Sequence, residues 1–454
     1  MSNDMLSTPR DIPSCAKAAG IVGTGGAGFP MHVKIQAKAD FVIANGAECE
    51  PILETDRHFM LRHPEKVVAG LRFAVEATGA EKGYLAVKAK HADLAALFTK
   101  QLKDEPRLEL FLLDNFYPAG DEHVLVHEVT GRVVPQGGIP IDVGAVVNNV
   151  FTLALLADAV QDKPFTHKYV TVTGEVNRPC VCEVPVGVSI GEVIETYGRG
   201  VKISDYKIVL GGPMMGKITD DLSTPVEKTT GGIIVVPSDH TLVLRKTSDL
   251  KHDFIKAKSV CCQCNLCTDM CPRNLLGHTL YPSRSMRVLP YLQGDFQMES
   301  IAQAALCTDC GLCQAFACNM NLSPNRVNNY FKKIMAEQGY KPDVKGRPMN
   351  PVSEYGALRH VPTPRLIQRL GIAKYDMHLP FDETPMKTKK LVLPLKMHIG
   401  ASCEPLVHTG DLVLRGQKIA QAPAGALGVD LHAPLEGMVR AIGSAIEIEA
   451  FEGV

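Results

Sequence analysis

Two runs of closely spaced cysteines constrain this chain more than any other feature of its sequence. The first run has the spacing Cys-x2-Cys-x2-Cys-x3-Cys-Pro between Cys261 and Pro272, and the second has Cys-x2-Cys-x2-Cys-x4-Cys between Cys307 and Cys318. The first spacing is a bacterial pattern for 4Fe-4S clusters, in which three thiolates come from one loop and the fourth cysteine ligates the other cluster. The sequence therefore predicts two 4Fe-4S clusters that exchange one ligand.

The crossover rule assigns four ligands to each cluster. Cluster one takes the first three cysteines of the first run and the last of the second, namely Cys261, Cys264, Cys267 and Cys318. Cluster two takes the other four, namely Cys271, Cys307, Cys310 and Cys313. A pair of zinc sites is the alternative, but zinc ligands usually come as two pairs separated by a longer arm. Cys262, inside the first loop, is interpreted as a bystander.

Length, composition and charge exclude several classes of protein. A chain of 454 residues suggests three or four domains. Fourteen cysteines, with a polar stretch at residues 1–10 in place of a signal core, favour a reducing, cytoplasmic compartment and metal binding rather than disulfides. The net charge of -1, without a basic run, argues against nucleic acid as a partner. We find no apolar stretch long enough to span a bilayer.

A glycine-rich loop near the N-terminus is the second feature with chemical meaning. Gly23-Thr-Gly-Gly-Ala-Gly-Phe-Pro30 satisfies the G-x-G-x-x-G fingerprint, and Glu48 lies twenty residues after Gly28. The fingerprint should follow a strand, whereas Ala16–Ala19 has helical composition. The six-residue pattern alone therefore fits a nucleotide-binding loop and a plain glycine turn equally well.

The longer context resembles the FMN-binding subunit of respiratory complex I and the NADH-binding subunit of Rnf-type ion-pumping complexes. Three later segments match in the same order: Asn45–Pro51, Tyr117–Glu122, and Val147–Asn149 with Thr152. The resemblance implies that FMN and NADH bind at residues of all these segments: Gly23, Thr24, Gly25, Gly26, Ala27, Gly28, Phe29, Lys34, Asn45, Glu48, Glu50, Tyr117, Gly120, Asp121, Glu122, Val147, Asn148, Asn149 and Thr152. The chain departs from complex I at three positions, which are Thr24 for Arg, Ala47 for Asp and Asp121 for Glu.

The rest of the chain resembles the same superfamily. Gly211–Gly216 is similar to a β-grasp (SLBB) domain, and His398–Ala401 with Gly410–Asp411 is similar to a barrel-sandwich domain. Rnf-type subunits carry the barrel-sandwich domain first, whereas here it comes last. This order resembles the PduS-type cobalamin reductase family of propanediol-utilisation microcompartments.

The expected fold class is therefore multidomain, α/β plus α+β. The predicted regions are an FMN/NADH-binding α/β domain at 1–165, an SLBB domain at 166–248, a helical ferredoxin-like domain with two clusters at 249–340, a linker or wrap at 341–390, and a barrel-sandwich hybrid β domain at 391–454. Within the second of these we also predict a strand at Thr241–Leu244 from its β-branched and apolar residues.

The C-terminal domain is related in pattern to lipoyl and biotinyl carriers. Its nearest lysine candidate, Lys396, lies early in the domain rather than at a central hairpin tip, so we favour a docking module over a swinging-arm carrier. Asp430-x-His432 is similar to the start of a corrinoid-binding motif, but Leu435 replaces the expected glycine. We interpret His432 as an ordinary turn residue.

The resemblance implies an enzyme that passes electrons from NADH to FMN, then to two 4Fe-4S clusters, and finally to cobalamin. The flavin itself takes the hydride, so no catalytic side chain is assigned. One alternative is an Rnf-like module that reduces a glycyl-radical activase, a flavodoxin or a shell-protein cluster. Another is a non-enzymatic relay scaffold. The implied partners include a microcompartment shell protein or a cobalamin adenosyltransferase, and the implied location is cytoplasmic, inside a bacterial microcompartment.

Overall fold

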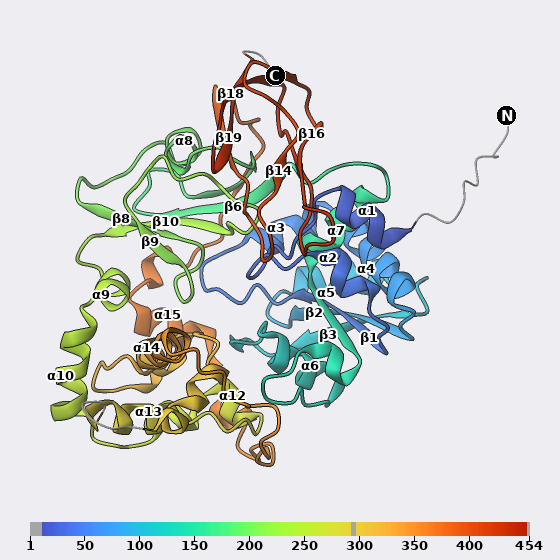
Figure 1. Cartoon of the computed structure of the whole chain (residues 1–454). Coiled ribbons are helices and arrows are strands. Elements are labelled where there is room, and N and C mark those ends of the chain that lie inside the picture. Colours follow the sequence, from blue (N-terminus) through green and yellow to red (C-terminus); the bar gives the residue numbers. More distant parts are fainter. Residues whose placement is uncertain (1–10, 292–296, 452–454) are drawn as a thin grey trace.

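The computed structural model describes residues 11–291 and 297–451. Two regions built on sheets lie side by side, the helices around the cysteine runs lie below them, and a small β domain near the C-terminus lies above (Figure 1). Within the described residues, no helix has the length and apolar character needed to cross a membrane.

The N-terminal region contains a parallel four-stranded sheet in the order β3-β2-β1-β5. Its strands are β1 (Phe41–Gly46), β2 (Lys82–Lys88), β3 (Leu108–Leu113) and β5 (Ala145–Asn149). The helices of this region are α1 (Ile12–Ala18), α2 (Met31–Gln36), α3 (Thr55–Arg62), α4 (Pro64–Thr78), α5 (Ala92–Gln101), α6 (Glu122–Thr130) and α7 (Val150–Ala159). A Cβ at Gly70 would lie 1.8 Å from the Leu153 carbonyl oxygen, so this glycine lets α4 and α7 pack backbone to backbone.

The second region is a six-stranded mixed sheet in the order β12-β7-β6-β10-β8-β9. Its strands are β6 (His167–Gly174), β7 (Cys180–Pro185), β8 (Tyr206–Leu210), β9 (Lys217–Thr219), β10 (Gly232–Pro237) and β12 (Phe381–Asp382). Helix α8 (Ile190–Thr196) begins at Ser189, whose hydroxyl accepts a hydrogen bond from the Glu192 amide. Such a cap satisfies one of the unpaired amides at a helix start.

The predicted strand at Thr241–Leu244 is wrong, because these residues begin helix α9 (Thr241–Thr247). Strand β10 ends at Pro237, and the side chain of His240 accepts a hydrogen bond from the Leu242 amide, which starts a helix. The neighbours Leu242 and Val243 are both buried, and this burial fits a short helix rather than a strand with alternating faces.

The cysteine-rich region is helical. Its helices are α10 (Leu250–Val260), α11 (Leu266–Asp269), α12 (Pro272–Leu275), α13 (Pro282–Val288) and α14 (Pro324–Glu337). A π-helical turn covers Cys313–Ala317 in the second cysteine run. Figure 1 shows α10 at the outer edge of this region and α12 on the side of α6.

The proline-rich segment at 341–390 connects the regions rather than bridging open space. Strand β11 (Val361–Pro362) pairs with β4 (Phe116–Tyr117) of the N-terminal region, and β12 pairs with β7 of the second sheet. Helix α15 (Thr363–Leu370) lies between these strands in the chain. The segment therefore ties the first two regions together.

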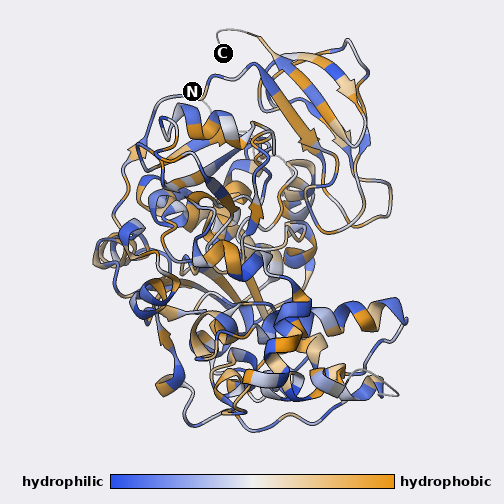
Figure 2. Ribbon diagram, turned by 90° about the vertical axis from the view of Figure 1, so that its left-hand side faces the viewer, coloured by the Kyte–Doolittle hydropathy of each residue, from blue (hydrophilic) through white to orange (hydrophobic). Residues whose placement is uncertain are grey.

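The C-terminal domain consists of two small antiparallel sheets. Their strands are β13 (Lys390–Pro394), β14 (Glu404–Pro405), β15 (Leu412–Val413), β16 (Lys418–Gln421), β17 (Leu431–His432), β18 (Gly437–Ile442) and β19 (Ala445–Ala450). Hydrophobic and hydrophilic residues alternate along these strands in Figure 2, as expected for strands with one buried face. Our interpretation of His432 as a turn residue is wrong, since it is buried in β17 and pairs with Lys418.

Candidate functional site

The eight predicted ligand cysteines gather in two separate hollows of the helical region. Cys261, Cys264, Cys267 and Cys318 line the first hollow. Cys271, Cys307, Cys310 and Cys313 line the second. The fold thus brings the last cysteine of each run beside the first three of the other run, which is the grouping that a crossed pair of clusters requires.

The extra residue in the second run is absorbed by the π-helical turn. The Cys318 amide donates to the Cys313 carbonyl oxygen, 3.1 Å away, across one residue more than an α-turn spans. In the first run, the equivalent stretch is the α-helical α11. Single π turns of this kind are common at functional sites, because they insert a residue without unravelling a helix. Cys318 therefore still reaches the first hollow.

Burial raises the pKa of several of these thiols and so favours their protonated form before metal arrives. Burial raises the pKa of Cys267 to about 12 and that of Cys271 to about 11. It also raises the pKa values of Cys310 and Cys313 well above that of a free thiol. A cluster binds thiolates, so its assembly must release protons here, and the attraction of iron has to offset desolvation.

The second hollow lies against the N-terminal region. The Tyr117 hydroxyl donates to the Cys310 carbonyl oxygen at 2.7 Å. Arg273, two residues after Cys271, forms an ion pair with Asp121 at 2.8 Å, and both side chains are largely buried. Tyr117 and Asp121 belong to the segment predicted to bind flavin, so the stretch of chain predicted at one site contacts the residues of the other.

The glycine loop is closed by its own backbone and held against the start of α7. The Gly23 amide donates to the Phe29 carbonyl oxygen at 2.9 Å. The Thr24 amide donates to the Thr152 hydroxyl at 3.0 Å, and the Thr24 hydroxyl donates to the Asn149 side chain at 3.1 Å. These contacts fix the loop beside the carboxyl end of β5, where ligands of α/β sheets usually bind.

Two observations agree with the predicted flavin site at this loop. A Cβ at Gly26 would meet no atom within 4 Å, so the backbone faces open space there, whereas one at Gly25 would meet the Asn149 side chain at 3.1 Å. The buried side-chain nitrogen of Asn148 has no hydrogen-bond partner among the described residues. A cofactor that lies on Gly26 and accepts from Asn148 satisfies both features.

The charged residues nearby are held by other groups of the protein. Lys34 donates to Glu122 at 2.6 Å and to the Val147 carbonyl oxygen at 3.0 Å. Its ammonium group therefore lies beside the middle of β5, two residues before the strand ends, where it can offset the charge of a phosphate. Asn45 donates to the Gly120 carbonyl oxygen at 2.9 Å, which joins two of the predicted segments.

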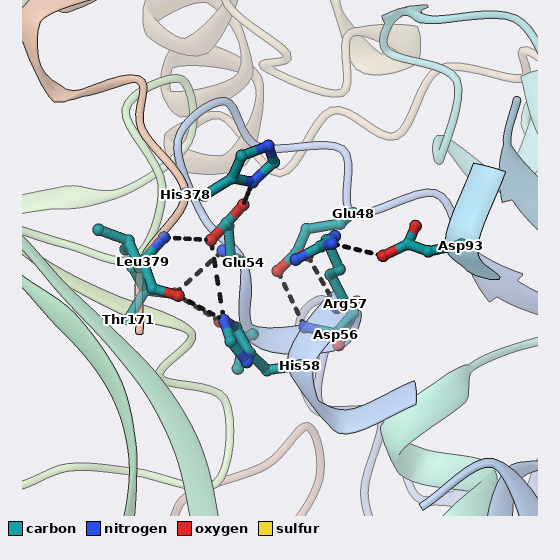
Figure 3. Close-up of polar contacts among 10 residues, drawn as sticks. Glu48, Glu54, Asp56, Arg57, His58, Asp93, Thr171, His378 and Leu379 are labelled. Carbon is teal, nitrogen blue, oxygen red and sulfur yellow. Dashed lines mark hydrogen bonds and ion pairs between the residues drawn. The ribbon is translucent and has the colours of Figure 1, made fainter. Parts of the chain in front are cut away.

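Glu48 and Glu50, both predicted to contact the cofactors, are bound by backbone amides. The Glu48 carboxylate accepts from the amides of Asp56 and Arg57 at 2.9 and 3.0 Å (Figure 3). Glu50 accepts from the amides of Met214 and Met215 at 2.8 and 2.9 Å. Glu50 thus anchors the glycine-rich turn of the second region.

A buried polar group that the sequence does not predict adjoins the flavin loop. Asp56 accepts from the Asn149 side chain at 2.7 Å. Burial, together with the charge of Asp56, raises the pKa of Glu48 to about 8, and burial lowers the pKa of Lys168 to about 8. Asp56 and Lys168 lie in no recognisable motif, so the sequence does not indicate that they are close in space.

Glu54 connects three regions of the fold. It accepts from the Leu379 amide at 2.7 Å and from His378 at 3.1 Å, as Figure 3 shows. Burial disfavours its charged form, but the hydrogen bonds from His58, Leu379 and His378 outweigh burial and lower the pKa of Glu54 to about 2. The Glu54 amide also donates to the Thr171 hydroxyl at 3.1 Å.

The C-terminal domain contacts the glycine loop directly. The Ile399 amide donates to the Gly28 carbonyl oxygen at 3.2 Å. The buried Lys228 donates to the Gly20 carbonyl oxygen at 2.6 Å and to the Asp430 carbonyl oxygen at 3.3 Å. The loop is therefore held from outside by two other regions.

Four family models match the chain in succession. The Nuo51 FMN-binding domain matches residues 16–158, the SLBB domain 169–217, the 4Fe-4S dicluster domain 260–323 and the RnfC barrel sandwich hybrid domain 375–452. These matches confirm the predicted multidomain fold class, with its flavin, SLBB, two-cluster and barrel-sandwich components.

Similar proteins span nearly the whole chain. Cobalamin reductase PduS of Citrobacter freundii is 41% identical over 438 residues, which is 96% of each chain. Cobalamin reductase PduS of Salmonella typhimurium is 40% identical over 97% of this chain and 96% of its own. One subunit of the Na(+)-translocating ferredoxin:NAD(+) oxidoreductase complex of Acetobacterium woodii is 38% identical over 59% of each chain. In a crystal structure of an NAD+-reducing [NiFe]-hydrogenase, one chain aligns over 76% of this chain and 65% of its own, with 22% identity and a TM-score of 0.48.

Proposed function

Because the chain belongs to the cobalamin reductase PduS family, we propose that its crossed cysteine sets hold two 4Fe-4S clusters and that its glycine loop holds FMN. The protein is an oxidoreductase that carries electrons from NADH through a flavin and iron–sulfur clusters to cobalamin. The main support for these two sites is the contact between the residues that form them. Tyr117 of the flavin segment bonds to Cys310 of cluster two, and Asp121 pairs with Arg273 beside Cys271.

The glycine loop positions the flavin through its backbone. The open face at Gly26 admits the cofactor, Lys34 offsets the phosphate charge, and the free amide of Asn148 donates to it. Bound FMN supplies the conversion of a two-electron hydride into single electrons, while the protein supplies orientation. Thr24, Asn149 and Thr152 keep the loop in place through their mutual hydrogen bonds.

The positions of the two cysteine sets indicate the order in which electrons pass through the clusters. The cluster-two set is covered by the flavin segment, so it receives electrons first. The cluster-one set lies farther along the helical region, with Cys264 exposed to solvent, so it delivers them outward. Glu50 is assigned to positioning, since it binds the turn at Met214 and Met215 rather than the nucleotide.

The decisive experiment separates flavin reduction from electron delivery. The anaerobically reconstituted full chain should bleach its flavin with NADH and then reduce hydroxocobalamin. The double variant Cys264→Ala/Cys310→Ala should keep the bleaching and lose cobalamin reduction. A circular-dichroism melt checks that it is folded, since loss of a metal site can unfold a domain. Normal cobalamin reduction by a folded, cluster-free variant would show that electrons leave directly from the flavin.

We also propose a cytoplasmic location inside a bacterial microcompartment, with a shell protein or a cobalamin adenosyltransferase as a partner. The support is the resemblance to the propanediol-utilisation enzymes, whose domain order this chain shares. Sedimentation of the tagged protein with purified microcompartments tests the location, and co-purification tests each partner. Recovery of the protein outside the compartments, without either partner, would contradict both assignments.

A further inference from the structure

The two cysteine sets differ in what covers them. Tyr117 and the Arg273–Asp121 ion pair contact the cluster-two side, and none of the four cysteines of that set is exposed. The cluster-one hollow opens to solvent, because Cys262 and Cys264 on its wall are both exposed. None of the residues lining this hollow is acidic. A partner that accepts electrons from the protein would therefore meet the cluster-one face.

Four exposed cations lie on two helices, of which one leads into the first cysteine run and the other contacts Cys318. We call them the cationic rim: Lys256 and Lys258 on α10, and Arg365 and Arg369 on α15. Lys258 lies three residues before Cys261. The Arg369 guanidinium lies 3.5 Å from the Cys318 carbonyl oxygen, and Arg365 lies 5.6 Å from the ring centre of Phe316, two residues from Cys318.

The rim cations are not neutralised within the protein. In the described part of the chain, none of the four forms an ion pair with an acidic side chain. The nearby acid Asp253 is buried and paired with Arg326, and Asp269 is paired with Arg359. The rim therefore presents four positive charges that no acidic side chain of the described residues offsets in an ion pair.

Apolar side chains are exposed beside the rim. Ile255 on α10 is 67% exposed, and Met320, two residues after Cys318, is 42% exposed. Methionine and arginine are enriched where proteins bind proteins. A surface that combines exposed apolar groups with unpaired cations suits a macromolecular partner better than it suits a small ion.

We propose that the cationic rim is the docking surface for an acidic face of a redox protein, a second acceptor besides cobalamin, which also takes electrons from cluster one. The inference rests on the proposed function, since it assumes that a cluster is held there. One electron leaves the reduced cluster, which becomes oxidised, and enters the acceptor of the partner, which becomes reduced; no bond forms or breaks. Charge complementarity of this kind speeds association and selects partners.

The test uses the full chain with its clusters reduced by dithionite, so that it does not depend on NADH or flavin. Two paramagnetic probes of opposite charge, tris(oxalato)chromate(III) and hexaamminechromium(III), broaden the electron paramagnetic resonance signal of an accessible cluster. The anionic probe should work at about tenfold lower concentration than the cationic one, which is the lower end of electrostatic steering. The preference should vanish in 1 M salt, where the screening length is about 3 Å.

Double variants that reverse the charge of rim residues test whether the rim causes the preference for the anionic probe. Arg365→Glu/Arg369→Glu and, on a different helix, Lys256→Glu/Lys258→Glu should each abolish the preference for the anionic probe. The control Lys100→Glu/Lys103→Glu makes the same change of charge on exposed residues at the end of α5 and just beyond it, and should leave the preference intact. Two separate pairs keep the test valid if one of them fails to fold.

Poly-L-glutamate distinguishes a protein face from a small ligand. It should shield cluster one from the anionic probe in the parent chain and in the control, but not in the charge-reversal pairs. Shielding by hydroxocobalamin instead would show that the rim is a corrinoid-binding site, and would overturn the proposal. An unchanged probe preference with a shifted midpoint potential in the charge-reversal pairs would also overturn it, because the rim would then serve only to balance the charge of the cluster. Failure of NADH to reduce the clusters would contradict the proposed function without changing these measurements.

Discussion

The hydroxyl group of Tyr117 donates a hydrogen bond to the backbone carbonyl oxygen of Cys310, 193 residues later in the chain. This bond joins the segment predicted to bind flavin to the loop predicted to bind cluster two. Tyr117 is buried and Cys310 is half-buried, so the bond helps to keep the two sites at a constant separation.

Replacement of Tyr117 by phenylalanine should loosen this junction. The variant keeps the ring but leaves the Cys310 carbonyl oxygen unpaired, so we expect the free energy of unfolding to fall by about 1 kcal/mol. Denaturant unfolding of the reconstituted chain measures this, and rapid mixing with NADH should show slower cluster reduction at normal flavin reduction. Tyr84→Phe, in a strand where the hydroxyl forms no hydrogen bond in the described structure, is the control. Equal effects of the two changes would contradict a role for the bond.

Replacement of Cys318 by alanine should damage the cluster of the other run. Iron and sulfide analysis of the parent chain should give about eight of each, as two cubanes require. In Cys318→Ala, the spectrum of cluster one should be lost and that of cluster two largely kept, while Cys271→Ala should show the reverse. Loss confined to cluster two in Cys318→Ala would show that the clusters do not exchange ligands. Stoichiometric zinc without iron would refute clusters altogether.

Replacement of Gly26 by valine should prevent flavin binding while the clusters still assemble. A side chain there enters open space in the protein and therefore the space that the cofactor needs. Flavin content after reconstitution with excess FMN is the measurement. Gly443→Val, on the β18–β19 hairpin, also points into open space and serves as the control. Full FMN occupancy of the Gly26 variant would refute the placement of the site.

The pH dependence of stability should carry the signature of Glu48. Its pKa is raised from about 4.5 to about 8, so the folded state keeps a proton that the unfolded chain releases. Stability from this group is full below pH 4.5 and declines as pH rises toward 8. Glu48→Gln should flatten the decline of the unfolding free energy over that range, whereas Glu76→Gln, on the exposed face of α4, should not. An equally steep decline in Glu48→Gln would show that the carboxyl ionises freely.

The spacing of residues in the sequence predicts the regular strands and the two cysteine sets, because each of these leaves a pattern over a short stretch of chain. The structure gathers the eight cysteines in the two predicted sets, while their assignment as ligands stays a prediction that iron analysis tests. The helix at Thr241–Thr247 escaped prediction because its cap and two adjacent buried residues depend on neighbours in the fold. Strand β12 has two residues, which is too few for a periodic pattern.

The distant contacts of the site had no signal in the sequence. Glu50 is bound by the amides of Met214 and Met215, 164 and 165 residues away, so motif comparison assigned it to the nucleotide. The proximity of Asp56 and Lys168 likewise arises only when the first and second regions pack together. Such relationships depend on the arrangement of domains, which local patterns do not specify.

The π-helical turn at Cys313–Ala317 also matters for recognising related proteins in genomes. A search that demands three residues before the final cysteine of a cluster run would find the first run of this chain but miss the second, although the fold brings Cys318 beside the first three cysteines of the first run. The inserted residue does not prevent Cys318 from reaching the first cysteine set, because the helix widens locally to accommodate it. Surveys of iron–sulfur proteins should therefore allow a gap of four at that point, and check each candidate for a helix that can bulge there.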